Sequence, residues 1–134
     1  MHDMIFVNLP VADIARSRTF FTDLGYSFNE DFCDGKALAL VLGESQCAML
    51  LETSWFATFH DAGTADATKQ KECLVALSAR SKEEVDTLVD KAVSLGATEG
   101  RSQDLGFLYG RSYDDLDGHT WEIIWMDQAG PQQG

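Results

Sequence analysis

The spacing of apolar residues along the chain alternates between two periods. An apolar, β-branched run over residues 4–11 predicts a strand. Residues 12–25 then place their apolar side chains on one helical face, with Asp13 as a cap at the start and Gly25 at the end. Three short strands are predicted next, separated by turn residues, over 26–32, 36–43 and 47–53.

The second half of the chain repeats this order. Residues 72–79 predict a strand, and residues 81–96 predict the clearest helix of the chain. Ser81 and Glu84 form a capping box at its start, and Gly96 ends it as Gly25 ends the first helix. Three more strands are predicted over 97–102, 106–114 and 119–126.

The repeated order β-α-β-β-β indicates two tandem modules of an α+β fold. We expect one domain over residues 1–134, with modules at 4–52 and 72–126. Residues 53–71 form the predicted connector, and residues 127–134 a disordered tail.

Composition narrows the functional classes. The net charge of −12 makes nucleic acids and anionic membrane surfaces poor partners. The 45% of hydrophobic residues suffices for a core, but no apolar run is long enough to span a bilayer. Three widely spaced cysteines, without a metal-binding pattern or a secretory signal, predict reduced thiols in a cytoplasmic protein.

Two stretches resemble the vicinal oxygen chelate superfamily, which includes glyoxalase I, extradiol dioxygenases, fosfomycin-resistance enzymes and bleomycin-resistance proteins. LPVADIARSRTFFTDLGYSF at residues 9–28 resembles the family's opening signature. DDLDGHTWEII at residues 114–124 resembles its closing strand, with Leu116 where the family often has proline. The resemblance extends from Met4 to Met126. It implies a glyoxalase-like fold, in which the two modules curl a mixed sheet into a cup, rather than a particular reaction.

Metal-dependent members of that superfamily hold a divalent ion on the first and fourth strands of each module. The resemblance implies that Phe6, Leu50 (or Met49 in a shifted register), Leu74 and Glu122 occupy the four ligand positions. Only Glu122 carries a suitable donor, whereas a catalytic site generally needs about three protein ligands. We therefore predict no metal cofactor, the alternative being a divalent ion near Glu122.

Apolar residues at three of the four metal-ligand positions predict an apolar cavity with a few polar groups. Glu122 is expected to be largely buried and paired with Arg111, which lies on a neighbouring strand. Connector aromatics are expected to form a lid. A structural role in the core is the alternative for each of these residues, and Trp121 and Trp125 are expected to pack against a helix. The predicted ligand-binding residues are Glu122, Arg111, Tyr109, Asn8, Trp55, Phe59, Phe6, Leu50 and Leu74.

Three functions remain open at this point. The first is metal-independent binding of a small molecule in an aromatic-lined cleft, as in bleomycin-resistance proteins. The second is a metal-dependent enzyme of lactoylglutathione lyase or dioxygenase type, a lyase or an oxidoreductase. The third is a dimeric interaction protein whose cavity is filled by side chains. The sequence favours the first, in a homodimer, because its apolar strand edges need cover.

Overall fold

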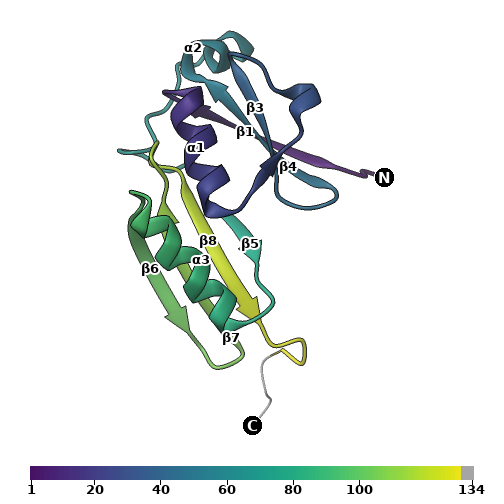
Figure 1. Ribbon diagram of the computed structural model, residues 1–134, viewed down its shortest axis with the longest axis vertical. Helices are drawn as coiled ribbons and strands as arrows, with labels where there is room; N and C mark the ends of the chain where they lie inside the picture. The colour runs from purple at the N-terminus through teal and green to yellow at the C-terminus, as the bar shows by residue number, and fades with distance from the viewer. Residues whose placement is uncertain (131–134) are drawn as a thin grey trace. The chain divides into compact units, whose positions relative to one another are not determined.

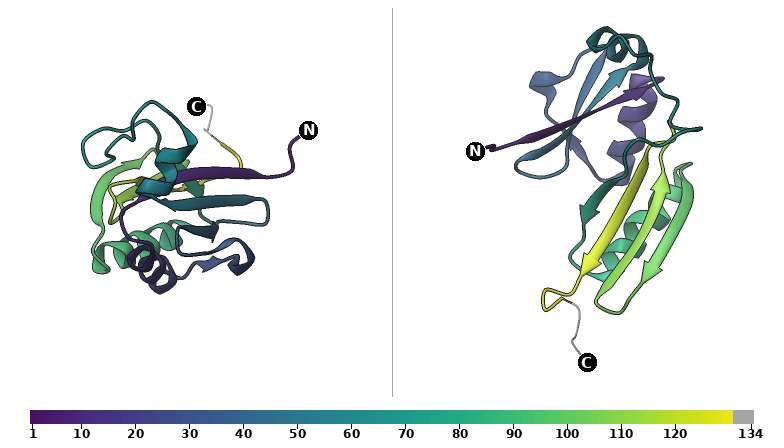
Figure 2. Two further views of the ribbon diagram at one scale, coloured as in Figure 1. Left: turned by 90° about the horizontal axis from the view of Figure 1, so that it is seen from above. Right: turned by 180° about the vertical axis from the view of Figure 1, so that it is seen from behind.

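A computed structural model describes residues 1–130, which form two compact units divided at Asp66 and Ala67. Each unit has a four-stranded sheet with one long helix on one face (Figures 1 and 2). The predicted α+β fold of two tandem βαβββ modules is therefore confirmed. No helix among residues 1–130 is long and apolar enough to cross a membrane.

The first unit has the strand order β1-β4-β3-β2, in which β1 and β4 are parallel and the other neighbours are antiparallel. Short helical segments follow β2 and β4. The elements are β1 (Ile5–Val11), α1 (Ile14–Leu24), β2 (Ser27–Phe28), η1 (Glu30–Phe32), β3 (Ala37–Val41), β4 (Gln46–Glu52), α2 (Thr53–Phe56) and η2 (Ala57–Phe59).

Local chemistry sets the limits of the elements in this unit. The Asp13 carboxylate accepts a hydrogen bond from the Arg16 backbone N–H at the start of α1, and Gly25 ends the helix at φ 112°. The strand predicted over residues 26–32 is shorter than expected. The Asn29 side chain accepts from the Asp31 backbone N–H, which favours the 3-10 turn η1 over a continued strand.

The second unit has the equivalent order β5-β8-β7-β6, with β5 and β8 parallel. Its elements are β5 (Val75–Ser78), α3 (Lys82–Ser94), β6 (Thr98–Asp104), β7 (Leu108–Asp114) and β8 (Thr120–Met126). Residues 127–130 form a turn closed by a hydrogen bond from the Gly130 N–H to the Asp127 carbonyl. The rest of the predicted tail, 131–134, lies outside the described residues.

Helix α3 begins and ends where the sequence predicts. The Ser81 hydroxyl accepts a hydrogen bond of 3.0 Å from the Glu84 backbone N–H, and Gly96 follows the helix at φ 111°. Val85 and Val89 are fully buried against the sheet. Trp121 is also buried, on the face of the sheet that α3 covers, and Lys82 of α3 lies over the Trp125 ring, in agreement with the expected position of both tryptophans beside a helix.

A buried carboxylate organises the turn between β7 and β8. Asp115 accepts hydrogen bonds from the backbone N–H groups of Asp117 and His119 and a 2.8 Å bond from Trp121 Nε1. Burial raises the pKa of the Asp115 carboxyl, and these donors together with His119 oppose the shift. The turn is thereby tied to the core of the second unit.

Candidate functional site

The two faces of the second sheet carry different side chains. The register places Arg111 of β7 opposite Ile123 of β8, on the face covered by α3. It places Ser112 opposite Glu122, on the face that α3 leaves open. Arg111 and Glu122 therefore lie on neighbouring strands but point to opposite sides of the sheet.

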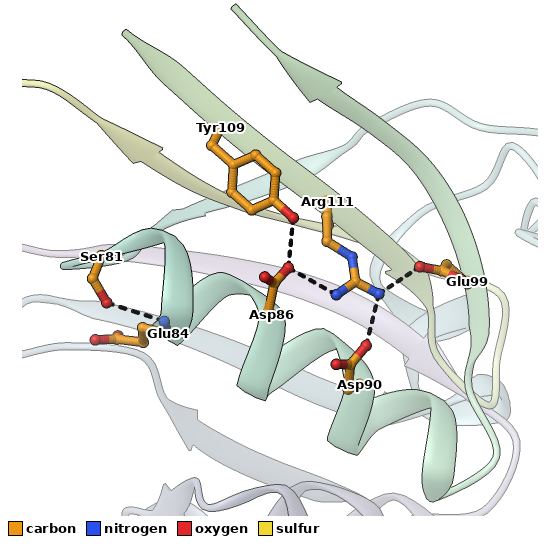
Figure 3. Close-up of polar contacts among 7 residues, drawn as sticks. All are labelled: Ser81, Glu84, Asp86, Asp90, Glu99, Tyr109 and Arg111. Atoms are coloured by element: carbon orange, nitrogen blue, oxygen red, sulfur yellow. Dashed lines mark hydrogen bonds and ion pairs between the residues drawn. The ribbon is translucent and has the colours of Figure 1, made fainter. Parts of the chain in front are cut away.

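Arg111 is the centre of an ionic network on the α3 side (Figure 3). Its Nη1 donates to Asp86 at 2.9 Å, and its Nη2 lies 2.8 Å from Asp90 and 2.5 Å from Glu99. The Tyr109 hydroxyl donates to the same Asp86 carboxylate at 2.5 Å. Only 13% of the Arg111 side chain is exposed, so this guanidinium is committed to α3 and β6.

The ionic network shifts the pKa values of its members. Burial lowers the pKa of Arg111, but its hydrogen bonds to Asp90, Glu99 and Asp86 raise it above the ordinary value. The hydrogen bond from Tyr109, followed by that from Arg111, lowers the pKa of Asp86. The same bond to Asp86 raises the pKa of Tyr109. These shifts keep Arg111 positively charged, Asp86 ionised and Tyr109 protonated at neutral pH.

The predicted pair between Arg111 and Glu122 is wrong. Glu122 is half-buried, and among residues 1–130 its carboxylate has no hydrogen-bond or ion-pair partner. The reason lies in the turn, because Asp115 and His119 pair across three loop residues. An odd loop of this kind aligns odd-numbered residues of β7 with odd-numbered residues of β8. The turn sequence Leu-Asp-Gly at residues 116–118, between the strands predicted over 106–114 and 119–126, was the signal that could have revealed this.

A pocket of about 330 Å³ lies on the open face of the second sheet, beside Glu122. Gly110 is one of its lining residues, and a Cβ at this position would lie 3.3 Å from Ile124 Cγ1. Because glycine has no side chain, the surface of the sheet is hollow at this position of β7, between β6 and β8. The pocket is lined by Arg101, Ser102, Gln103, Leu108, Gly110, Arg111, Glu122 and Ile124.

A β-bulge shapes the β6 wall of this pocket. The register between β6 and β7 shifts between Glu99 and Ser102, so that Gly100 and Arg101 together oppose Ser112. A Cβ on Gly100 would lie only 2.4 Å from Ser112 Oγ, so a larger residue here would displace the Ser112 hydroxyl. The Ser112 hydroxyl donates to the Arg101 carbonyl at 3.0 Å and fixes the bulge.

Sequence reasoning identified two lining residues, Glu122 and Arg111, and missed the others. The sequence pattern puts Arg101 within a strand but does not show that it lines a pocket. Glycines at positions 100 and 110, inside otherwise regular strands, were the available signal, because such glycines mark bulges and close approaches.

The predicted residues of the first unit divide between its two faces. Phe6 and Asn8 of β1 are exposed and pair with Cys47 and Met49 of β4. Leu50 pairs instead with Leu9 on the helix-covered face and is fully buried. Its assignment to a cavity-lining ligand position is therefore wrong, and Met49 occupies the face of Phe6.

The remaining predicted residues lie at the ends of strands or in the connector. Trp55 and Phe59 contact each other edge to face, with ring centroids 5.2 Å apart, and Lys36 lies over the Trp55 ring. Leu74 precedes β5 and is 55% exposed. Neither aromatic ring lines the pocket beside Glu122, and the ligand-binding roles of these three residues stay predictions.

The residues around Glu122 do not fit the divalent metal centre of the superfamily that the sequence resembles. Its neighbours across the sheet are Ser112, whose hydroxyl is engaged by Arg101, and Ala76, which has no donor. The described residues contain no group of three or more His, Cys, Asp or Glu side chains able to hold a metal ion. One carboxylate falls short of the roughly three protein ligands of a catalytic site.

Comparisons with known proteins agree with this fold. A family model described as bleomycin resistance protein-like N-terminal matches residues 4–41. No curated protein matches the chain. A hypothetical protein from S. aureus is similar in structure, with 27% identity, a TM-score of 0.79, and coverage of 93% of this chain and 95% of that one.

Two further solved structures share the fold at lower identity. One is a glyoxalase/bleomycin resistance protein/dioxygenase family enzyme from Burkholderia phytofirmans, with 20% identity, a TM-score of 0.75 and coverage of 90% and 96% of the two chains. The other is a fosfomycin resistance protein from Listeria monocytogenes, with 15% identity, a TM-score of 0.68 and coverage of 96% and 97%. Together, these findings show that the chain has the fold of glyoxalase/bleomycin resistance/dioxygenase proteins, in agreement with the superfamily that its sequence resembles.

Proposed function

We propose that the chain binds a small organic molecule, without a metal ion, in the pocket on the open face of the second sheet. The carrying observation is the half-buried Glu122 carboxylate, which has no partner among residues 1–130 and borders a hollow floored by Gly110. A partly desolvated charge is costly without a partner. A ligand that donates hydrogen bonds would supply one.

The dimensions and lining of the pocket support this proposal. Its volume of about 330 Å³ lies at the lower end of the roughly 300–1,000 Å³ that small-molecule sites occupy. Leu108 and Ile124 provide apolar walls, and a few polar groups converge between them. The fold relationship to bleomycin and fosfomycin resistance proteins supports the proposal that this fold can accommodate a small molecule.

A fragment screen by nuclear magnetic resonance tests the proposal. We expect fragments that shift the backbone amides of Gly110, Ser112 and Glu122 in the wild-type protein. Gly110→Val fills the hollow and should abolish these shifts. Gly35→Val is the matched control, because a Cβ at Gly35 meets no atom within 4 Å.

The outcomes of the screen separate clearly. Shifts that survive in Gly110→Val, or a complete lack of pocket binders in a diverse library, would overturn the proposed function. Circular dichroism of both glycine variants shows whether each is folded. Should Gly110→Val fail to fold, Gly110→Ala, which adds one methyl group, provides a milder version of the same test.

We also propose that the chain forms a homodimer through β1. This strand lies at the edge of its sheet, and Ile5 and Phe6 are 57% and 53% exposed. An exposed apolar edge favours association with another copy. Analytical ultracentrifugation should show a dimer that Ile5→Lys disrupts and Phe32→Lys, at another exposed aromatic position, leaves intact. A monomeric wild type at micromolar concentration contradicts this proposal.

The three cysteines support the predicted cytoplasmic location, which we retain as a proposal. Cys33, Cys47 and Cys73 are all free thiols, as expected in a reducing compartment. Recovery of the native protein in an oxidising cell fraction would contradict it.

A further inference from the structure

We infer that the pocket takes a small zwitterion, whose carboxylate is bound by Arg101 and whose ammonium group is bound by Glu122. This inference rests on the proposed function and adds the class of ligand. Its basis is that the two walls of one pocket carry opposite charges that nothing else in the described chain neutralises.

The arrangement of the two charges on the sheet supports this class of ligand. Gly100 and Arg101 of β6 oppose Ser112 of β7, and Ser112 opposes Glu122 of β8. The two charged residues thus lie in one row across three neighbouring strands. Since adjacent strands are roughly 4.8 Å apart, their backbones are separated by about 10 Å. A molecule lying across β7 can therefore reach one charge with each end.

Neither of the two charges has another partner among residues 1–130. Among residues 1–130, neither the Arg101 guanidinium nor the Glu122 carboxylate forms an ion pair, and the two do not contact each other. Arg111, the other cation in the lining, is occupied by three carboxylates on the opposite face. A ligand with only a carboxylate would leave the half-buried Glu122 without a partner, whereas a ligand with both charges also pairs the exposed Arg101.

The surface between the two charges also suits such a ligand. Gly110 provides a floor without a side chain, and Leu108 and Ile124 provide apolar contact. The Gln103 side chain offers an additional amide on the β6 wall. This surface suits a short apolar segment between the two charged ends, and the pocket volume of about 330 Å³ limits the ligand to a small molecule.

The test compares four probes of the same chain length. 6-Aminohexanoate carries both charges, hexanoate only the anion, hexylammonium only the cation, and hexanamide neither. We expect 6-aminohexanoate to bind about tenfold more tightly than either singly charged probe, because each end adds a charge-assisted hydrogen bond. Shifts of the Gly110, Ser112 and Glu122 amides report binding at this pocket.

Charge-removing variants assign each end of the ligand. Glu122→Gln should weaken 6-aminohexanoate and hexylammonium by about tenfold and leave hexanoate unchanged. Arg101→Gln should weaken 6-aminohexanoate and hexanoate and leave hexylammonium unchanged. Arg80→Gln and Glu83→Gln remove the same charges from exposed positions outside the pocket and should change none of the affinities.

Failure of the inference is distinguishable from failure of the proposed function. If library fragments bind in a manner blocked by Gly110→Val, but 6-aminohexanoate binds no better than hexanamide, the ligand class is wrong and the binding function stands. The same conclusion follows if the two pocket variants affect all four probes equally. If neither the fragments nor the four probes shift the pocket amides, both are overturned.

Discussion

The two modules share one backbone plan but distribute polar residues differently. In the first, β3 and β4 bury Leu38, Leu40 and Leu50 completely beneath the helix. In the second, the equivalent side holds the charged network of Arg111. The open faces differ as well, with Phe6 in the first module and Glu122 in the second. Backbone order alone therefore does not determine how polar residues are distributed over the faces of the two modules.

The largest expected effect concerns the aliphatic core of the first module. Leu50→Ala should lower the free energy of unfolding by about 2–5 kcal/mol, because it leaves a cavity in a fully buried site. Met49→Ala, one position away on the open face, should cost about 1 kcal/mol or less. Urea denaturation measures both. Equal losses would show that the two faces of β4 are not distinguished as described.

The next largest effect concerns the buried turn of the second module. Asp115→Ala should cost about 2–3 kcal/mol, because it leaves the buried Trp121 Nε1–H and two backbone donors without their acceptor. Asp115→Asn keeps one acceptor oxygen and should cost less. The measurement is again urea denaturation, and a similar loss in both variants would argue against a stabilising role for these hydrogen bonds.

A smaller effect on the free energy of unfolding is expected for the ionic network of Arg111. Arg111→Met should cost about 1–2 kcal/mol, because its three carboxylate partners are partly exposed and solvent screens them. A double-mutant cycle with Asp86→Asn should be non-additive, whereas a cycle with Glu122→Gln should be additive within about 0.5 kcal/mol. Coupling between Arg111 and Glu122 would contradict their placement on opposite faces.

The smallest effect concerns pH. The bonds from Tyr109 and Arg111 lower the folded-state pKa of Asp86, so ionised Asp86 stabilises the protein above its unfolded value of 3.8. This contribution is lost as pH falls through the folded pKa. The free energy of unfolding, measured at neutral pH and below pH 3.8, should depend less on pH in Asp86→Asn than in the wild type. Glu30→Gln, which removes the partner of Arg18 in the first module, should likewise make the pH dependence shallower, because the hydrogen bond from Arg18 lowers the pKa of Glu30.

The element order was predictable because its signals are local. The hydrogen bond from the Glu84 N–H to Ser81 and the positive φ of Gly25 are local features that the sequence pattern specifies. The relation between Arg111 and Glu122 is not local, since it depends on how two strands are aligned by the turn between them. Arg101 was harder still, because a bulge interrupts the alternation on which strand faces are assigned.

The bulge at Gly100 has a consequence for solubility as well. β6 forms one edge of its sheet, and all seven of its residues are exposed. A straight edge of this length offers unpaired backbone groups to any other extended chain. The irregular register, together with the charges of Glu99, Arg101 and Asp104, makes β6 a poor template for such pairing. The feature that shapes the pocket wall thus also protects the folded protein against edge-to-edge aggregation.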